Sequence, residues 1–255
     1  MFDLENCQVP AVLAQAPSES VSQRYTFIPT TRLIDDLRTL DWFPVGAKGS
    51  TRPQDIAARH MIRFRSRENL ETPLREVCPE LVIVNAHNGL CSFNLKAGLF
   101  RLVCSNGLIV SEAVFASIRI RHINYTYDAV RDAVFQYAER IPQITDKVEM
   151  LKQAELDDEL KLMFARMALL LRFNGDLELV QKIDLESLLR PIRTADIGDN
   201  AWNVLNVVQE KILNGRFEIP DHNRPREIRN VQRLITLNQR LFDLAGEVGR
   251  LSCAA

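Results

Sequence analysis

Hydrophobic and polar residues alternate strictly in two short stretches of the first half of the chain. In residues 60–66, Ile62 and Phe64 alternate with Arg63 and Arg65, and the same alternation returns at 118–121 in the order Ile-Arg-Ile-Arg. A period of two places successive side chains on opposite faces of a strand. The pattern therefore predicts two strands of one sheet, each with one apolar face and one arginine-bearing face.

Two Asn-Gly pairs lie between further apolar runs. Asn88-Gly89 separates residues 80–86 from 91–96, and Asn106-Gly107 separates 99–104 from 108–110. An Asn-Gly step supplies the two positive-φ residues of a type I′ turn, whose twist suits a two-residue hairpin. This spacing predicts an antiparallel meander over residues 80–110.

The remainder of the first half adds shorter elements. Residues 1–23, rich in Pro and Ser, are expected to form a flexible N-terminal arm. A short strand at 25–28, a helix from Thr30 or Thr31 to about Leu40 and a strand that begins at 42–45 should follow. Residues 24–124 are thus expected to be an antiparallel β-rich part with one helix.

From residue 127 onward the apolar period changes to 3.6, which indicates helices. The first helix should end near Pro142, and Asp146 with Glu149 resembles the capping pair that begins the next. Broad apolar stripes follow at 160–171, 202–212 and 226–248. We expect the stripe of Leu160, Met163, Phe164, Met167, Leu170 and Leu171 to lie in the core.

Strands followed by helices define the fold class as α+β. We expect an N-terminal antiparallel sheet with a hairpin meander and a mostly helical C-terminal half. Residues 125–255 should pack on the sheet as one domain.

The charge is nearly balanced overall but unevenly distributed. The chain has a formal net charge of −1, yet residues 24–124 sum to +5 and residues 125–200 to −5. Asp3 and Glu5 stand where a secretory signal would carry basic residues, and no apolar run is long enough to cross a bilayer, so a cytoplasmic protein without membrane attachment is expected. The five cysteines include no CxxC pair, and an odd number indicates reduced thiols.

The arginine-bearing strands carry the main candidate site. A solvated sheet face explains the pattern, but arginine is also the side chain suited to bidentate phosphate contacts. Tyr25, Trp42 and Tyr125 could stack bases beside it. The candidate nucleic-acid-binding residues are Arg59, Arg63, Arg65, Arg67, Lys96, Arg101, Arg119 and Arg121.

No motif indicates an enzyme. The chain has no GxGxxG, GxxxxGK[ST] or GxSxG sequence, and its four histidines share no metal-binding spacing. We therefore expect no catalytic residues, no cofactor and no metal.

Whole segments of the chain resemble a family of proteins of unknown function from prophages and plasmids, the phage/plasmid-like proteins. The similar segments are RYTFIPT at 24–30, RHMIRFR at 59–65, PELVIVNAHNG at 79–89, AGLFRLVCSNGLIV at 97–110, IRIRH at 118–122 and WNVLNVVQEKILNG at 202–215. The resemblance spans about residues 24–245 and implies a protein of a mobile genetic element, but no reaction.

Two hypotheses remain open. The arginine-bearing sheet could bind single- or double-stranded nucleic acid, since phage strand-annealing recombination proteins share a loosely similar order of elements, a likeness of fold alone. Alternatively, the acidic segment 125–200 could serve an anti-defence or regulatory factor that binds a host or phage protein. A homo-oligomer is compatible with both.

Overall fold

The fold is that of a computed structural model, which describes residues 2–71, 77–91, 93–101, 108–109, 118–120, 126–219 and 224–253. The chain divides into two compact units. Unit 1 comprises residues 1–141 and 229–232, and unit 2 comprises residues 142–228 and 233–255. The division falls at Pro142, inside a helix.

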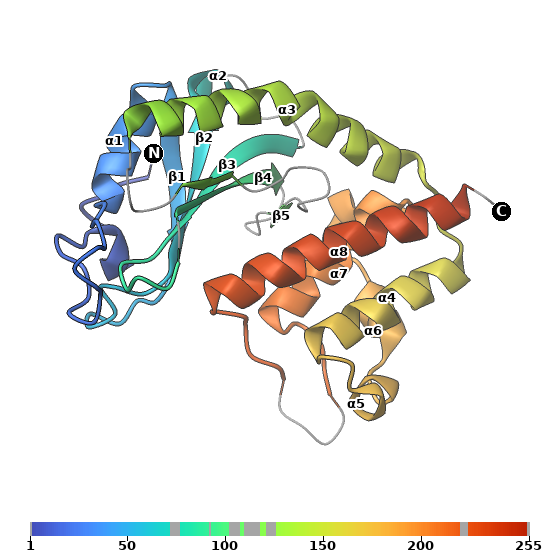
Figure 1. Cartoon of the computed structure of the whole chain (residues 1–255). Coiled ribbons are helices and arrows are strands. Elements are labelled where there is room, and N and C mark those ends of the chain that lie inside the picture. The colour runs from blue at the N-terminus through green and yellow to red at the C-terminus, as the bar shows by residue number, and fades with distance from the viewer. Residues whose placement is uncertain are drawn as a thin grey trace. The chain divides into compact units, whose positions relative to one another are not determined.

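Unit 1 is built around an antiparallel sheet of six strands (Figure 1). The strands follow the chain in the order β1-β2-β3-β4-β5, and β6 also pairs with β4. They are β1 (Trp42–Lys48), β2 (His60–Ser66), β3 (Val77–Asn85), β4 (Phe93–Arg101), β5 (Leu108–Ile109) and β6 (Ile118–Ile120). Among the described residues before 124, the same unit also contains the helical segments η1 (Pro10–Val12), α1 (Thr30–Arg38) and α2 (Arg67–Glu71). The α+β class and the antiparallel meander are confirmed.

The first predicted turn differs in detail. The last register pair of β3 and β4 joins Val84 to Asn94, so the connection is longer than two residues. Gly89 has a φ of +73°, whereas Asn88 is not among the residues with positive φ. A type I′ turn needs both, so that prediction is wrong. The second turn, Asn106-Gly107, lies outside the described residues. Strands β4 and β5 pair antiparallel as expected, but Leu108 pairs with Leu99, whereas a two-residue turn at 106–107 would pair it with Ser105.

The start of the chain is packed where a flexible arm was expected. Val9, Ala11, Val12 and Ala14 are all buried. The backbone carbonyl of Ala11 accepts a hydrogen bond from His87 Nε2 at 2.9 Å, which fixes the segment to the end of β3. The apolar residues of this segment pack on the core of unit 1. The free energy gained by burying them outweighs the tendency of the surrounding Pro- and Ser-rich residues to remain flexible.

Two further local expectations are corrected. Residues 25–28 form no strand, and α1 is preceded by Pro29 without a side-chain cap. Thr30 does not cap the helix because its hydroxyl is engaged in a buried polar network described below.

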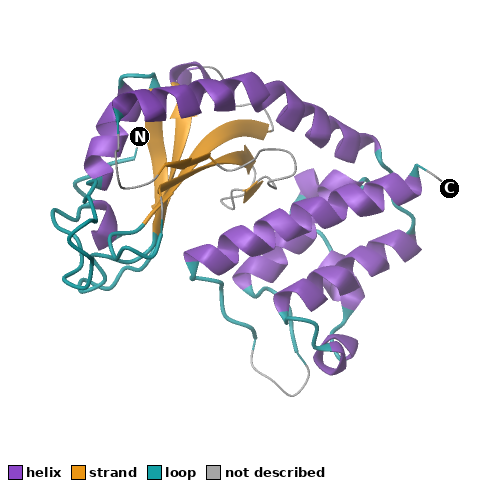
Figure 2. Cartoon of the chain, viewed as in Figure 1, coloured by secondary structure: helices purple, strands orange, loops and turns teal. Residues whose placement is uncertain are grey.

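Unit 2 consists of helices, whereas the strands gather in unit 1 (Figure 2). The helices after the sheet are α3 (Tyr127–Gln153), α4 (Asp158–Arg172), α5 (Leu177–Gln181), α6 (Leu185–Leu189), η2 (Thr194–Asp196), α7 (Ala201–Asn214) and α8 (Val231–Ser252). Side-chain caps begin four of them and come from Asp157, Asp176, Asp184 and Asn200. Gly215 ends α7 with a φ of +66°, the left-handed conformation that favours glycine.

Helix α3 continues through Pro142, where it was expected to end. A proline inside a helix removes one hydrogen bond and costs about 3 kcal/mol. Beyond it, Ile144, Val148 and Leu151 are buried, so the apolar stripe continues as far as Leu151 and offsets that cost. Asp146 and Glu149 consequently lie inside α3 and do not begin a new helix.

No helix among the described residues combines the length and the apolar character needed to cross a membrane.

Candidate nucleic-acid interface

The alternation in β2 is confirmed. Ile62 and Phe64 are fully buried on one face of the sheet, and Arg63 and Arg65 lie on the other face. We call that second face the arginine face; Arg63, Arg65 and their neighbours Glu80, Val82 and Lys96 form it. The register places Arg63 opposite Val82, and Val82 opposite Lys96.

The arginine face is not open to solvent, contrary to expectation. Glu80 of β3 is only 1% exposed, and its carboxylate accepts hydrogen bonds from Arg65 Nε at 2.9 Å and Arg63 Nη1 at 3.3 Å. Arg65 itself is 8% exposed. Burial raises the pKa of Glu80, and the two guanidinium groups oppose that effect. Phosphate binding by Arg65 would therefore have to break a buried ion pair.

Helix α3 explains why this face is covered. The fully buried Tyr137 of α3 lies beside Glu80 and Cys78, whose charged forms contribute to its raised pKa after burial itself. Its ring also meets that of Trp42 edge-on, with centroids 5.4 Å apart. Trp42 is buried, so it is not free to stack a base.

The other predicted residues are spread over unit 1. Arg59 Nη1 donates to Gln232 Oε1 at 2.7 Å, and Lys96 is half-buried. Arg67 is exposed; it pairs with Asp41 at 2.9 Å and its guanidinium lies 4.8 Å from the centre of the Phe43 ring. The backbones of Arg101 and Arg119 belong to β4 and β6, their side chains lie outside the described residues, and so do Arg121 and Tyr125.

A second group of arginines was not among the binding residues predicted from the sequence. Residues 224–240 contain five arginines and one glutamate, a local excess of positive charge in a chain whose net charge is nearly zero. Four of them belong to unit 2 and are exposed, and we call them the α8 arginines: Arg224, Arg226, Arg233 and Arg240.

Two of the α8 arginines meet a buried arginine at the end of α4. Arg172 is 6% exposed, and its Nη2 donates to the backbone carbonyl of Arg226 at 2.6 Å. Arg233 Nη2 in turn donates to the backbone carbonyl of Arg172 at 2.8 Å. Burial and then the charge of Arg233 lower the pKa of Arg172 to about 10. The positive charges of Arg172 and Arg233 are thus held close together, and Arg226 is bound to Arg172 through its backbone carbonyl.

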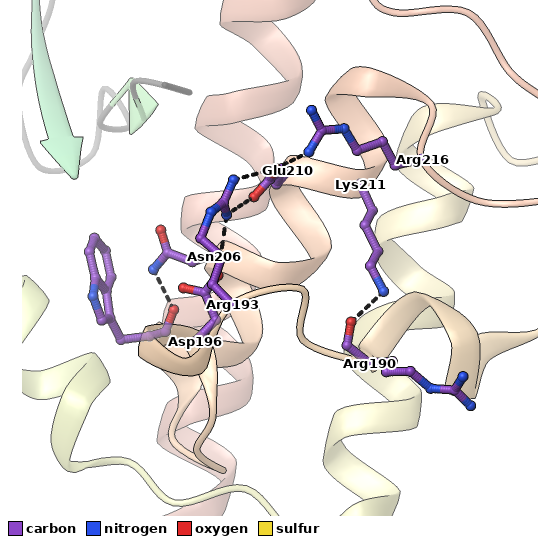
Figure 3. Close-up of polar contacts among 8 residues, drawn as sticks. Arg190, Arg193, Asp196, Asn206, Glu210, Lys211 and Arg216 are labelled. Atoms are coloured by element: carbon purple, nitrogen blue, oxygen red, sulfur yellow. Dashed lines mark hydrogen bonds and ion pairs between the residues drawn. The ribbon is translucent and has the colours of Figure 1, made fainter. Parts of the chain in front are cut away.

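A buried ion-pair network joins α7 to the segment before it (Figure 3). The carboxylate of Glu210 is bound by Arg193 and Arg216, with Arg193 Nη2 at 2.8 Å from Oε1. Asp196 also accepts from Arg193, at 3.3 Å. Lys211 donates to the carbonyls of Ser187 and Arg190, where α6 ends. Each charged side chain of this network has a hydrogen-bond partner within it, so we infer that the network stabilises the fold. We call it the Glu210 clamp.

We expect Glu210→Gln to lower the free energy of unfolding by about 2 kcal/mol. The substitution leaves the half-buried Arg193 without its main counter-ion, and the cost is below that of a fully buried pair because Arg216 is half-exposed. Chemical denaturation measures it. Glu218→Gln is the matched control, since Glu218 and Arg224 form an exposed pair worth at most about 0.5 kcal/mol. Equal effects of the two substitutions would contradict the Glu210 clamp.

A second buried network lies in unit 1, under the N-terminal segment. His60 Nδ1 lies 2.9 Å from the Ala58 carbonyl, so this nitrogen carries the proton and Nε2 accepts from the Thr30 hydroxyl at 2.8 Å. Asn85 Nδ2 donates to the same hydroxyl oxygen at 3.1 Å. His87 Nε2 donates to Ala11. Burial lowers the pKa of His60 to about 4, so the ring is neutral at pH 7.

Neither network contains a metal-binding arrangement. Within the described ranges no three His, Cys, Asp or Glu side chains are grouped so that they could hold a metal ion. Among the described residues, Cys7, Cys78, Cys91 and Cys253 take part in no disulfide, and burial raises the pKa of Cys78 to about 11.

Comparison with known proteins gives a family but no activity. A family profile described as a domain of unknown function, DUF932, matches residues 17–242. The chain is 30% identical over 245 residues to the UPF0380 protein YafZ and 29% identical to the UPF0380 protein YfjQ, both from Escherichia coli strain K12. Each alignment covers 93% of this chain and 87% of the relative. No solved structure matches the chain significantly.

Proposed function

The chain belongs to the DUF932 family, whose function is unknown, and we propose that this member binds nucleic acid without sequence specificity. The α8 arginines contact backbone phosphates, which are the part of a nucleic acid that every sequence shares. The resemblance to strand-annealing proteins fits such an activity. The arginine face of the sheet has a different task, because Arg63 and Arg65 hold Glu80.

The observation that carries the proposal is the accumulation of exposed arginines on a short segment beside a buried one. Arg226 and Arg233 are exposed and both touch Arg172, which has no carboxylate partner within the described part of the chain. Such a group of like charges costs folding energy, and an external polyanion compensates it. Arg67 over Phe43 is a secondary contact of the same kind, with a guanidinium beside an aromatic ring.

Replacing Arg224, Arg226, Arg233 and Arg240 together by Gln is expected to weaken binding to a labelled single-stranded oligonucleotide. Each phosphate contact that is lost lowers the number of counterions released on binding, so the slope of log affinity against log salt should flatten by up to about 0.7 per contact. Fluorescence anisotropy at several salt concentrations measures both quantities. Double-stranded DNA and RNA measured in parallel establish the preferred strand form.

The control removes the same charge from exposed positions elsewhere, as Arg24, Arg38, Arg52 and Arg166 replaced by Gln. It should keep most of the affinity and the salt slope. An equal loss in both variants would mean that net charge alone acts, and would reject the assignment to the α8 arginines. Absence of binding to any DNA or RNA at low salt would reject the function.

A protein partner is the second candidate, and one observation favours it. The apolar stripe of α4 was expected to lie in the core, but only Phe164, Ala165, Ala168 and Leu169 of this helix are buried apolar residues. Leu162, Met163 and Met167 are 36–43% exposed. The apolar stripe of α4 is therefore wider than the buried part of the helix surface. Exposed methionines are common on adaptable binding surfaces.

Met163→Glu with Met167→Glu tests this second candidate. Both side chains are exposed, so the fold should persist. If α4 binds a host or phage protein, or a second copy of the chain, the variant should lose a partner that the wild type retains in a pull-down, or change its mass in light scattering. Identical behaviour of the two proteins would reject it.

We further propose that the protein acts in a prophage or plasmid, because its similar segments are those of the phage/plasmid-like family. Binding of single strands would then serve recombination or replication of the element. Genes for integration, replication or transfer on both sides of its own gene would support this origin.

A further inference from the structure

We infer that Arg172, Arg226 and Arg233 form a binding site for one phosphate group at the beginning of α8. This inference rests on the proposed nucleic-acid binding and names the residues that hold one backbone phosphate. Arg226 and Arg233 make the contacts from the solvent side, and Arg172 stands behind them as a fixed positive charge.

The geometry brings the three residues together through Arg172. Its guanidinium is bonded to the carbonyl of Arg226, and its own carbonyl is bonded by the guanidinium of Arg233. Arg172 is only 6% exposed, and its Nη1 has no hydrogen-bond partner within the ranges that the structure describes. A buried donor of a charged group normally has a partner, because leaving it unpaired makes the folded state less stable.

The N-terminal end of α8 adds to the positive electrostatic potential at this site. The first turns of α4, α5 and α6 carry acidic residues, as the helix dipole favours. The first turn of α8 has no acidic residue and instead includes Arg233. The partial positive charge of the helix end and the arginines therefore act on the same place, and a phosphate compensates both.

A purely structural role would explain less. Arg172 does join the end of α4 to the segment before α8, and a neutral donor could make the same bond to a carbonyl. A structural role for Arg233, which donates to the Arg172 carbonyl, needs a donor but no second positive charge, and this charge makes the ionisation of Arg172 less favourable. An anion between the two supplies that reason.

The test measures binding of inorganic phosphate to the full chain. Thermal unfolding is followed with increasing sodium phosphate, and with sodium chloride at the same ionic strength. The midpoint of the wild type should rise with phosphate beyond the chloride control, since a ligand that binds only the folded state stabilises it. Titration calorimetry should show phosphate binding about tenfold weaker in Arg233→Gln, the expected loss for one charge-assisted contact.

Arg233 is exposed, so its replacement should leave the fold intact, and Arg250→Gln, an exposed arginine of the same helix outside the α8 arginines, is the matched control. Arg250→Gln should bind phosphate like the wild type. An unchanged response to phosphate in Arg233→Gln, or the same midpoints in phosphate and chloride for the wild type, would overturn the site.

Competition with a single-stranded oligonucleotide separates this inference from the proposed function. Displacement of the oligonucleotide by phosphate, lost in Arg233→Gln, supports both. Phosphate binding without any oligonucleotide binding supports the site for free phosphate or a small phosphate ester and rejects the function. Oligonucleotide binding that neither phosphate nor Arg233→Gln alters rejects the site and leaves the function standing.

Discussion

Glu80→Gln is expected to lower the free energy of unfolding of unit 1 by about 3 kcal/mol. The change removes the charge that compensates Arg65, which is 8% exposed, and Arg63 beside it. Loss of one partner from a buried ion pair costs about 3–5 kcal/mol, because the remaining charge stays in a medium of low polarity. The lower end applies because Arg63 retains some contact with water.

Chemical denaturation followed by circular dichroism measures this loss, and amide hydrogen exchange in β2 and β3 assigns it to the sheet. The two units need not unfold together, so the exchange data identify the unit that weakens. Asp35→Asn is the matched control, since Asp35 pairs with Arg38 on an exposed helix surface and should cost at most about 0.5 kcal/mol. A change below about 1 kcal/mol in Glu80→Gln would show that the arginine face is hydrated after all.

Acid should destabilise unit 1 through His60 by about 3 kcal/mol. The pKa of His60 is about 4 in the folded protein and 6.5 when the ring is exposed on unfolding. Between these values the unfolded chain binds a proton that the folded chain does not. Stability therefore falls as the pH is lowered from 6.5, and the loss is complete near pH 4. The magnitude follows because a tenfold change in a proton-binding constant is worth about 1.4 kcal/mol.

His60→Gln isolates this contribution. The Gln carbonyl can accept the Thr30 hydroxyl, as His60 Nε2 does at 2.8 Å, but it cannot take up a proton. The variant should show a flatter loss of stability between pH 6.5 and 4 than the wild type, whatever its stability at pH 7. Parallel curves for the two proteins over this range would contradict a buried neutral His60. Because His87 of the same network binds the Ala11 carbonyl, limited proteolysis near residue 11 should increase over the same pH range.

The sequence by itself determined part of the local structure of unit 1. Period-two alternation placed β2 at residues 60–66 and put Ile62 and Phe64 on the buried face. The antiparallel pairing of β4 with β5 was expected from the Asn-Gly pair between them, although its register was not. These features depend on neighbouring residues and on strand geometry, so they can be inferred from short stretches of chain.

Only the tertiary structure decided what the arginine face does. Alternation gives two faces but does not say what covers each one. The partner of Arg65 is Glu80, which lies fifteen residues away, and the register of β2 with β3 sets the two side by side. Tyr137 then covers them from a helix whose position no local pattern specifies. A polar strand face can be solvated or held by buried ion pairs, and the difference depends on contacts distant in sequence.

The arginines before and in α8 show the same limit of prediction from the sequence. Their composition was visible in the sequence, but the significance of Arg226 and Arg233 depends on Arg172, more than fifty residues earlier. The continuation of α3 through Pro142 likewise followed from the burial of Ile144, Val148 and Leu151. Local rules fix which conformation a segment prefers. The energy of long-range burial decides whether that preference holds, because it exceeds the cost of one broken helix bond and sets which charges must find partners within the fold.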